Sequence, residues 1–512
     1  MKNTYRSLLV FSVLAASTLA AGAARADIEW SWGAFVENDL RVSVDRVDEP
    51  GINRNETALG VDLRVDLLPD KLRFVGNLKF AWIGFTKDTE FEGLTTRNVV
   101  SPYYLESDAA YIQVIEILPY LDLRIGRQIV NWGTADMFNP TSNMNAVDLE
   151  DPIKFGERVA NEMIKLDWNP GGSDFIFTAV WAPVFQPANL PGSALLAVGD
   201  PESMFPFVSP ETRMRAERLR NIYLRNPEYY NILQPEVTAT MPDFTLDNSQ
   251  LGFKVAFLVG MFDMSLSYYR GIDTIPVARK SYSTAERNGE TASDGTPVLD
   301  VLTDVKLVYP RKQVVGFDLA GQLPFLDDAG FWFEGALVFP ERVQMEFDIR
   351  EVAPGAEVIT DDTVAKQPFF KYTVGADYTI NEHLFVMAQF IHGFVDEFGY
   401  NNINDYWLVN GDIKMLQEKL LIRLSAMGEI PHDDDDLPLD DDGDGMVESF
   451  APGATDDGRI SSLALVPAIV AKPVDGLELT FGAYFLLGHN ESKFAMPAAG
   501  PSLAYFRARA SF

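Results

Sequence analysis

Positively charged side chains recur an even number of positions apart in several short stretches of this 512-residue chain. One such stretch carries Lys71, Arg73 and Lys79, with Leu72, Phe74 and Phe80 at the neighbouring alternate positions. Because successive side chains of a β-strand point to opposite faces, these cations share one face and the bulky apolar groups share the other. Rings of cationic groups around a water-filled passage favour anions. The pattern therefore predicts passage of anions along a basic wall.

The same alternation places eleven basic and seven acidic side chains on the polar face. The basic ones are Arg64, Lys71, Arg73, Lys79, Arg124, Lys254, Lys371, Lys414, Arg423, Arg507 and Arg509. The acidic ones are Asp62, Asp66, Asp122, Asp318, Asp377, Asp412 and Glu478. Two interpretations stay open, since these groups either select anions in a passage or form ion pairs between strands that brace the wall.

A second group of cations lies in the long connection 186–247. Ser209-Pro210-Glu211 is a helix start, with a capping serine and a proline at the first position, and the predicted helix runs to about Leu224. It carries four arginines, namely Arg213, Arg215, Arg218 and Arg220. The connection is too long to be structureless. It either folds into a lumen as an arginine-lined constriction or lies on the surface against lipopolysaccharide phosphates.

The connection 431–458 is strongly acidic and has the spacing of a calcium loop over part of its length. Asp440, Asp442 and Asp444 match alternate ligand positions, and Glu448 follows at the ninth. The twelfth position is Ala451 instead of glutamate, so the loop is not an EF-hand. It is interpreted as an irregular Ca²⁺ site in an outer loop or as a solvated acidic loop; no other cofactor is expected.

An enzymatic role is not predicted. The chain has four histidines, at 383, 392, 432 and 489, and none has the spacing of a Ser/His/acid triad. The formal net charge of −32 argues against nucleic acid as a partner.

The N-terminus predicts export. Lys2 and Arg6 precede an apolar run, and Ala24-Arg25-Ala26 is a cleavage site, so residues 1–26 are a predicted signal peptide and 27–512 the exported protein. No later apolar run is long enough for a transmembrane helix. The chain has no cysteine, so its fold needs no disulfide. A closed β-barrel is the membrane structure that remains.

Alternation of apolar and polar residues predicts eight hairpins. They are 59–67 with 72–82, 111–118 with 121–132, 161–168 with 174–185, 249–259 with 263–271, 313–323 with 329–339, 369–380 with 384–394, 405–416 with 420–430, and 459–471 with 477–488. An opening strand at 28–44 and a closing strand at 503–512 bring the number to about 18. Arg127 is out of phase with its strand, which a bulge at Gly126 or a place near the rim explains.

The connections alternate in length. Short turns such as Leu68-Pro69-Asp70 join each hairpin, and proline suits such turns. The long connections are 45–55, 87–106, 134–160, 186–247, 273–312, 340–367, 395–404, 431–458 and 489–500. Within 134–160, the polar run 139–151 is a candidate to fold over or into the lumen. Short periplasmic turns and long extracellular loops are typical of transmembrane barrels. The fold class is therefore all-β, an antiparallel transmembrane barrel in a bacterial outer membrane.

Two stretches resemble known families. Leu503 to Phe512 alternates Phe506, Ala508 and Ala510 with Arg507 and Arg509, and resembles the closing strand of bacterial outer-membrane β-barrels. The resemblance implies that the barrel-assembly machinery reads the terminal Phe512. The run from Gly126 to Gly133, followed by Phe138-Asn139-Pro140, resembles a segment of alginate-export-like and related uncharacterised outer-membrane channels. It implies a substrate channel.

The predicted function is passive diffusion of a hydrophilic, anionic solute or polymer through a basic-lined lumen of a monomeric or trimeric porin-like channel. Its predicted partners are outer-membrane lipid and lipopolysaccharide. Two alternatives remain, a calcium-dependent surface receptor or adhesin and a transporter of apolar, fatty-acid-like substrates. The charged wall argues against the second alternative.

Overall fold

The structure is a computed structural model. It describes residues 28–45, 51–83, 103–135, 137–154, 156–172, 174–191, 223, 225–351, 358–399, 403–430, 437–439, 449–451, 461–488, 492–495 and 499–512. The predicted signal peptide lies outside these residues, and its assignment stays a prediction.

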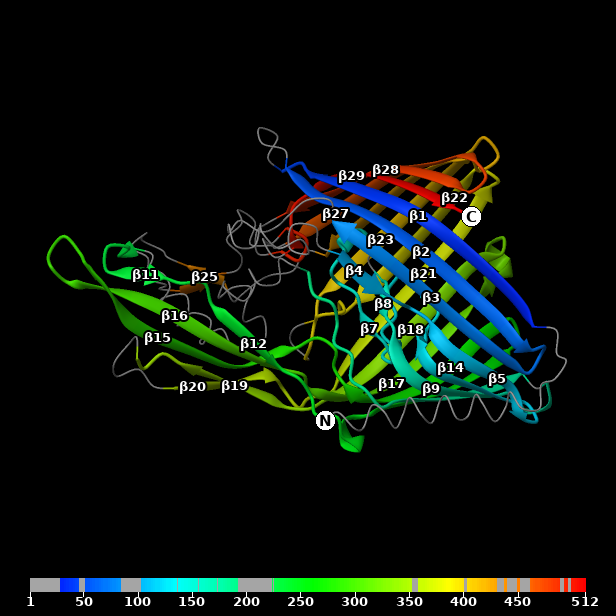
Figure 1. Ribbon diagram of the computed structural model, residues 1–512, viewed down its shortest axis with the longest axis horizontal. Helices are drawn as coiled ribbons and strands as arrows, with labels where there is room; N and C mark the ends of the chain where they lie inside the picture. Colours follow the sequence, from blue (N-terminus) through cyan, green and yellow to red (C-terminus); the bar gives the residue numbers. More distant parts are fainter. Residues whose placement is uncertain are drawn as a thin grey trace.

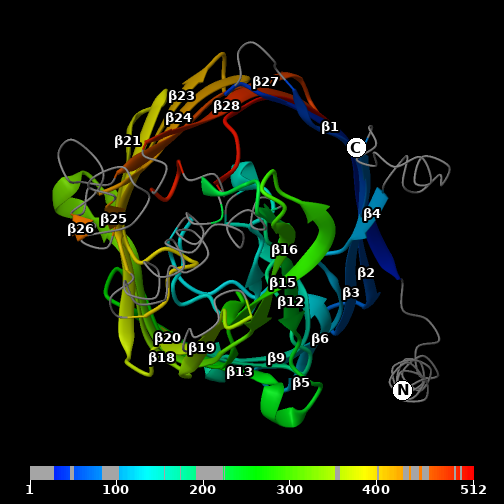
Figure 2. The ribbon, with the colours of Figure 1, turned by 90° about the vertical axis from the view of Figure 1, so that its left-hand side faces the viewer.

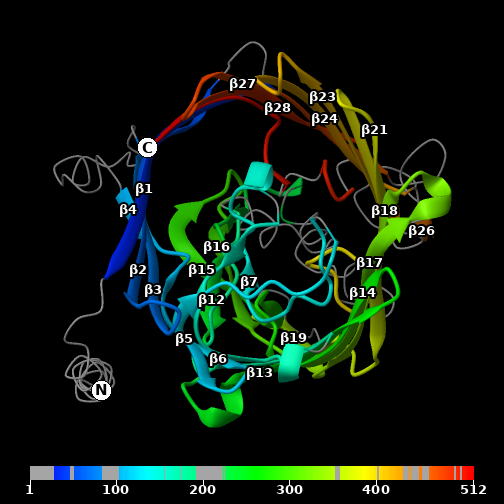
Figure 3. The same ribbon diagram turned by 90° about the vertical axis from the view of Figure 1, so that its right-hand side faces the viewer.

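Eighteen antiparallel strands close into a barrel (Figures 1, 2 and 3). In order they are β1 (Glu29–Ser43), β2 (Ile52–Leu68), β3 (Leu72–Ile83), β5 (Ala110–Leu118), β6 (Leu121–Gln128), β9 (Asn161–Trp168), β10 (Phe175–Ala182), β13 (Gln250–Val259), β14 (Phe262–Ile272), β17 (Arg311–Leu323), β18 (Ala329–Pro340), β21 (Phe369–Asn381), β22 (Leu384–His392), β23 (Asp405–Met415), β24 (Leu420–Glu429), β27 (Ser462–Val474), β28 (Leu477–Gly488) and β29 (Leu503–Ser511). The short β4 (Tyr103–Glu106) pairs with β3 beyond the end of β5 and occupies the same place in the ring. The predicted barrel is confirmed.

The first and last strands close the ring. β1 pairs with β29 from Phe35 opposite Ser511 to Ser43 opposite Leu503. Every backbone group along this seam therefore has a neighbouring strand to bond, as a membrane-spanning sheet requires. Within the described residues, helices that could cross a bilayer are not found.

The outer face of the barrel is apolar. On β2, Leu59, Val61 and Leu63 are more than one-third exposed although they lie mid-strand, as expected of side chains that meet lipid. Aromatic rings are exposed near the short-turn end, for example Trp168, and near the other end, for example Trp82. Such rings mark the two membrane interfaces of an outer-membrane barrel.

The connections at one end are short turns, as predicted. Asp70 and Tyr120 adopt left-handed backbone angles there, with φ of 58° and 66°. At the opposite end most of the connections are long, and several carry structure of their own. The asymmetry is that of a transmembrane barrel with its long loops outside the cell.

A second sheet stands beyond the long-loop end, and the sequence patterns did not predict it. It comprises β11 (Tyr230–Ile232), β12 (Glu236–Thr240), β15 (Val277–Thr291), β16 (Pro297–Val308), β19 (Val343–Asp348) and β20 (Ile359–Val364). The β15–β16 hairpin projects away from the barrel (Figure 1), and in the view of Figure 2 it falls within the outline of the ring. Two two-stranded ladders are also present, β7 (Ala146–Val147) with β8 (Arg158–Val159) and β25 (Leu437–Leu439) with β26 (Ser449–Ala451). The described residues also include short 3-10 turns, η1 (Pro152–Lys154), η2 (Pro170–Gly172), η3 (Leu246–Asn248) and η4 (Pro324–Leu326).

One predicted strand is too long. The stretch 121–132 was expected to span the wall, but β6 ends at Gln128 and the chain then turns into the barrel. Arg127 lies next to this end on the outer face, where its guanidinium is 3.3 Å from the carboxylate of Glu162 on β9. The position near the rim therefore explains why Arg127 shares a face with apolar residues of its strand. A bulge at Gly126 is not the reason, since the β5–β6 register is continuous past this residue.

Candidate functional site

The interior of the barrel holds residues 129–135, 137–154 and 156–160, which we call the constriction segment. Its side chains Val130, Trp132 and Met144 are almost fully buried. They pack in one cluster with interior-facing Tyr269 of β14 and Val314 of β17, together with Ala336 and Phe369. In Figures 2 and 3 the cyan loop of this region lies inside the ring of strands. The proposal that the polar run 139–151 folds into the lumen agrees with this placement.

One end of the segment is held by the buried carboxylate of Glu334 on β18. Its Oε1 accepts hydrogen bonds from the backbone N–H and the hydroxyl of Thr141, at 2.8 and 2.7 Å. Its Oε2 accepts from the N–H groups of Thr134 and Ala135 and from the side-chain amide of Asn139, at 3.1, 3.3 and 3.2 Å. Gly133 has φ of 90°, and a Cβ there would lie 2.3 Å from this carboxylate. A single carboxylate thus holds four residues of the segment.

The other end is held by Arg41 on β1. Its guanidinium donates two hydrogen bonds of 2.6 Å to the carboxylate of Asp151. It also donates to Asp39 on its own strand, at 3.1 and 2.7 Å. All three side chains are buried, so this is a desolvated charge network with paired hydrogen bonds, the strongest form of such contact.

These two anchors lie on opposite walls. Counted around the ring from β1, β18 is the eleventh of the eighteen strands. The constriction segment therefore crosses the lumen and is tied at both sides.

The ion pair between Arg41 and Asp151 should persist at mildly acidic pH. Burial alone would raise the pKa of Asp151, but the hydrogen bonds and positive charge of Arg41 outweigh it and lower the pKa to about 2. An ordinary aspartate titrates near pH ~3.9, so the anchor stabilises the segment fully above about pH 4 and weakens as the pH falls toward 2. We expect single-channel conductance to stay constant between pH 7 and pH 4; a step increase near pH 5 would contradict this assignment.

Two further connections reach into the same interior, although the sequence predicted them as outward loops. Phe394, from the connection after β22, packs against Phe138 of the constriction segment, with the two rings tilted and their centroids 4.8 Å apart. Phe494, from the connection before β29, joins the same buried cluster. Lys493 is 2.5 Å from Asp396, which ties these two connections together.

The predicted wall residues face the interior, and most are paired with acids. Arg73 contacts Asp66 at 2.5 Å, Arg423 contacts Asp412 at 2.7 Å, and Arg507 contacts Asp39 at 3.1 Å. The remaining contacts join Arg64 to Asp66, Lys79 to Glu106, Lys254 to Asp318, Lys414 to Glu418 and Arg509 to Glu37, whereas the Lys371 ammonium donates to the backbone carbonyl of Phe394. These pairs brace the wall.

The predicted excess of basic groups needs correction. Alternation missed four interior cations, which are Arg41, Arg54, Lys165 and Lys312, and more acids, which include Glu37, Asp39, Glu56, Glu106, Asp167, Asp263, Glu334 and Glu429. Carboxylates and cations are therefore close to balance along the described wall. The charged residues that alternation missed lie mostly at strand ends and in polar strands, where no apolar neighbours show which face of the strand a side chain occupies.

Two predicted groups of site residues lie outside the described part of the chain. These are the arginines at 213, 215, 218 and 220 and the acidic residues at 440, 442, 444 and 448. Their roles stay predictions. The same holds for the expectation that the chain is not an enzyme; His392, one of its four histidines, is on the outer face with its Nδ1 2.7 Å from Asp405.

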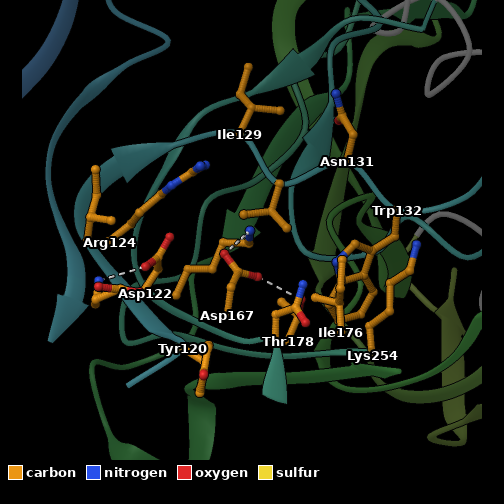
Figure 4. A pocket seen from close by; sticks show the side chains of 15 residues that line it. Tyr120, Asp122, Arg124, Ile129, Asn131, Trp132, Asp167, Ile176, Thr178 and Lys254 are labelled. Atoms are coloured by element: carbon orange, nitrogen blue, oxygen red, sulfur yellow. Dashed lines mark hydrogen bonds and ion pairs between the residues drawn. The ribbon is translucent and has the colours of Figure 1, made fainter. Parts of the chain in front are cut away.

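A cavity of about 830 Å³ lies against the constriction segment on the side of β5, β6, β9, β10 and β13. Arg124 and Asp122 stand on one side of it, Trp132, Ile176 and Lys254 on the other, with Asp167 and Thr178 between them (Figure 4). Its volume is in the range of small-molecule sites. Polar and apolar groups therefore meet in one space inside the barrel.

The motif from Gly126 to Pro140 belongs to this site. Trp132 lines the cavity, and its backbone N–H donates a hydrogen bond to the hydroxyl of Ser142. Asn139 bonds Glu334 and also the carbonyl of Ala135, at 2.7 Å. The motif was therefore a signal for the constriction segment, whereas nothing local marked Glu334 or Arg41 as its anchors.

Comparison with known proteins gives one family and several distant structures. Residues 115–398 match the family described as "Protein of unknown function (DUF1302)". Curated proteins give no match. Solved structures with a similar chain course include Pseudomonas aeruginosa OccK8 (OprE), at 9% identity over 94% of this chain and 98% of that chain with a TM-score of 0.46. Others are Pseudomonas aeruginosa OpdQ, at 7% over 95% and 97% with 0.46, and the Vibrio cholerae outer membrane protein OmpT, at 10% over 95% and 99% with 0.34.

Proposed function

The chain belongs to the family described as Protein of unknown function (DUF1302), and we propose that it is a diffusion channel of the bacterial outer membrane for small hydrophilic solutes. The observation that carries the proposal is a closed barrel, apolar outside and charged inside, whose lumen is crossed by a segment tied to both walls. A purely structural barrel has no need of such a segment. A narrowed, polar passage is what a size-limited channel requires.

The finer part of the proposal is a preference for negatively charged solutes. Paired cations such as Arg423 are neutralised by their acids and serve to brace the wall. A preference for anions then depends on cations that are not neutralised by a neighbouring acid. Arg124 is such a group, because no ion pair or hydrogen bond joins its guanidinium to any other residue in the described part of the chain.

Conductance across a planar bilayer tests both parts. The purified full-length barrel should give discrete single-channel steps in potassium chloride, and in a salt gradient its reversal potential should show chloride passing more readily than potassium. The same measurement after removal of 186–247 reports whether that connection narrows the pore, through a rise in conductance.

Each outcome has its own meaning. Absence of any conductance would overturn the channel proposal and favour the receptor or adhesin alternative, for which calcium-dependent binding is the next assay. A potassium preference would leave the channel standing and overturn the anion preference.

A further inference from the structure

We propose that the cavity beside the constriction segment is a binding site for small organic anions, with a carboxylate held by Arg124 and an apolar body held against Trp132 and Ile176. The inference rests on the proposed channel function and deepens it, since it names the solute class. It concerns the 830 Å³ space of Figure 4.

Among the residues that the structure describes, no acid forms an ion pair with Arg124. It faces the interior from β6, and its Nε is buried without a hydrogen-bond partner among the described residues. Its guanidinium carbon lies 5.7 Å from the centroid of the Tyr111 ring. A buried donor left unbonded is destabilising, and a guanidinium is shaped to bind a carboxylate through two parallel hydrogen bonds. An incoming carboxylate would give this guanidinium the acid partner that it does not have among the described residues.

The acids around the cavity are already engaged. Asp167 accepts hydrogen bonds from Lys165 at 2.6 Å and from Thr178 at 2.7 Å. Asp122 accepts the backbone N–H of Glu116 at 2.8 Å. The Glu116 carboxylate lies 3.1 Å from Lys71. Repulsion of an anion by these acids is therefore reduced.

A second cation lies across the cavity. Lys254 is only loosely paired, with its ammonium 3.8 Å from the Asp318 carboxylate. Figure 4 shows Arg124 and Lys254 on opposite sides of the space. An anion moving along the lumen thus meets two positive groups in succession.

Most of the remaining wall is apolar, apart from the amides of Asn131 and Asn169. Ile129, Val130 and Trp132 come from the constriction segment, and Ile176 comes from β10. Burial of apolar surface contributes about 25 cal/mol per Å², so a ring or short alkyl chain gains from this wall whereas an inorganic anion does not. The combination selects an organic monoanion over chloride or phosphate.

Benzoate is the probe for this site, with neutral benzamide and small acetate as controls. Added to single channels of the full-length protein, benzoate should reduce the potassium chloride current in a concentration-dependent way, and benzamide and acetate should do so at least tenfold less effectively. Arg124→Gln should raise the half-blocking concentration of benzoate about tenfold or more, because a charge-assisted hydrogen bond is lost. Arg124→Lys should raise it less, and Arg423→Gln, on the far wall, less than twofold.

Calorimetric titration of the detergent-solubilised barrel with benzoate separates the two proposals. Block or heat of binding that depends on Arg124 but not on Arg423 supports the site. Conducting channels that benzoate neither blocks nor binds would overturn this inference and leave the channel standing. Binding without conductance would keep the site and overturn the channel, and neither binding nor conductance would overturn both.

Discussion

Replacing Glu334 by alanine should at least double the single-channel conductance. The change removes the acceptor for five hydrogen bonds from Thr134, Ala135, Asn139 and Thr141. Each donor left unbonded in the interior costs about 1–3 kcal/mol, so the segment should leave the β18 wall. Planar-bilayer recording measures the conductance, and limited proteolysis near residues 134–141 reports the release.

Two variants control this prediction. Glu334→Gln keeps one acceptor oxygen and should give a smaller increase, whereas Glu478→Ala removes an interior carboxylate that contacts Lys472 instead of the segment. The Glu478 variant should conduct like the unchanged protein. If all three variants conduct equally, Glu334 does not hold the constriction.

Replacing Arg41 by alanine should destabilise the barrel strongly. The change leaves the carboxylates of Asp39 and Asp151 buried without their main cation, and removal of one partner of a buried ion pair typically costs about 3–5 kcal/mol. Urea unfolding of the barrel in detergent, followed by heat-modifiable gel mobility, measures the loss.

A double-mutant cycle isolates the anchor from general damage. Arg41→Ala with Asp151→Ala should be less destabilised than the sum of the two single changes, by about 0.5–3 kcal/mol, because the groups are in direct contact. Additive effects would show that the contact between Arg41 and Asp151 carries no coupling energy.

The barrel could be predicted from the sequence because the alternation of apolar and polar residues within each strand shows which side chains face lipid and which face the lumen. The hairpin predicted at 369–380 and 384–394 is found at Phe369–Asn381 and Leu384–His392, since lipid on one side and water on the other impose strict alternation. The stretch from Ser462 alternates poorly because its interior positions, such as Ala464 and Ala468, are themselves apolar and buried. There the inner wall meets packed loops instead of water.

The site was less predictable because it is made by contacts distant in sequence. Glu334 and Thr141 are 193 residues apart, and Arg41 and Asp151 are 110 apart. No local pattern distinguishes these acids and cations from others on the same face. The outer sheet was also missed, because the stretch lies between two barrel strands and was assigned to a loop, and because the buried positions of β16, Val298, Val301 and Val305, do not follow strict alternation.

A disulfide test addresses most directly the claim that the constriction segment crosses the lumen and lies against the far wall. The chain has no cysteine, and a Cβ added at Gly316 of β17 would lie 3.0 Å from Thr141 Cβ, close to the ~3.5–4.5 Å that a disulfide spans. In the membrane-embedded protein, Thr141→Cys with Gly316→Cys should form an intramolecular disulfide in high yield under mild oxidation, seen as a loss of two alkylatable thiols by intact-mass measurement. Thr141→Cys with Gly482→Cys, on the wall formed by β28, should not. Free thiols in the first pair, or equal cross-linking in both, would contradict the account.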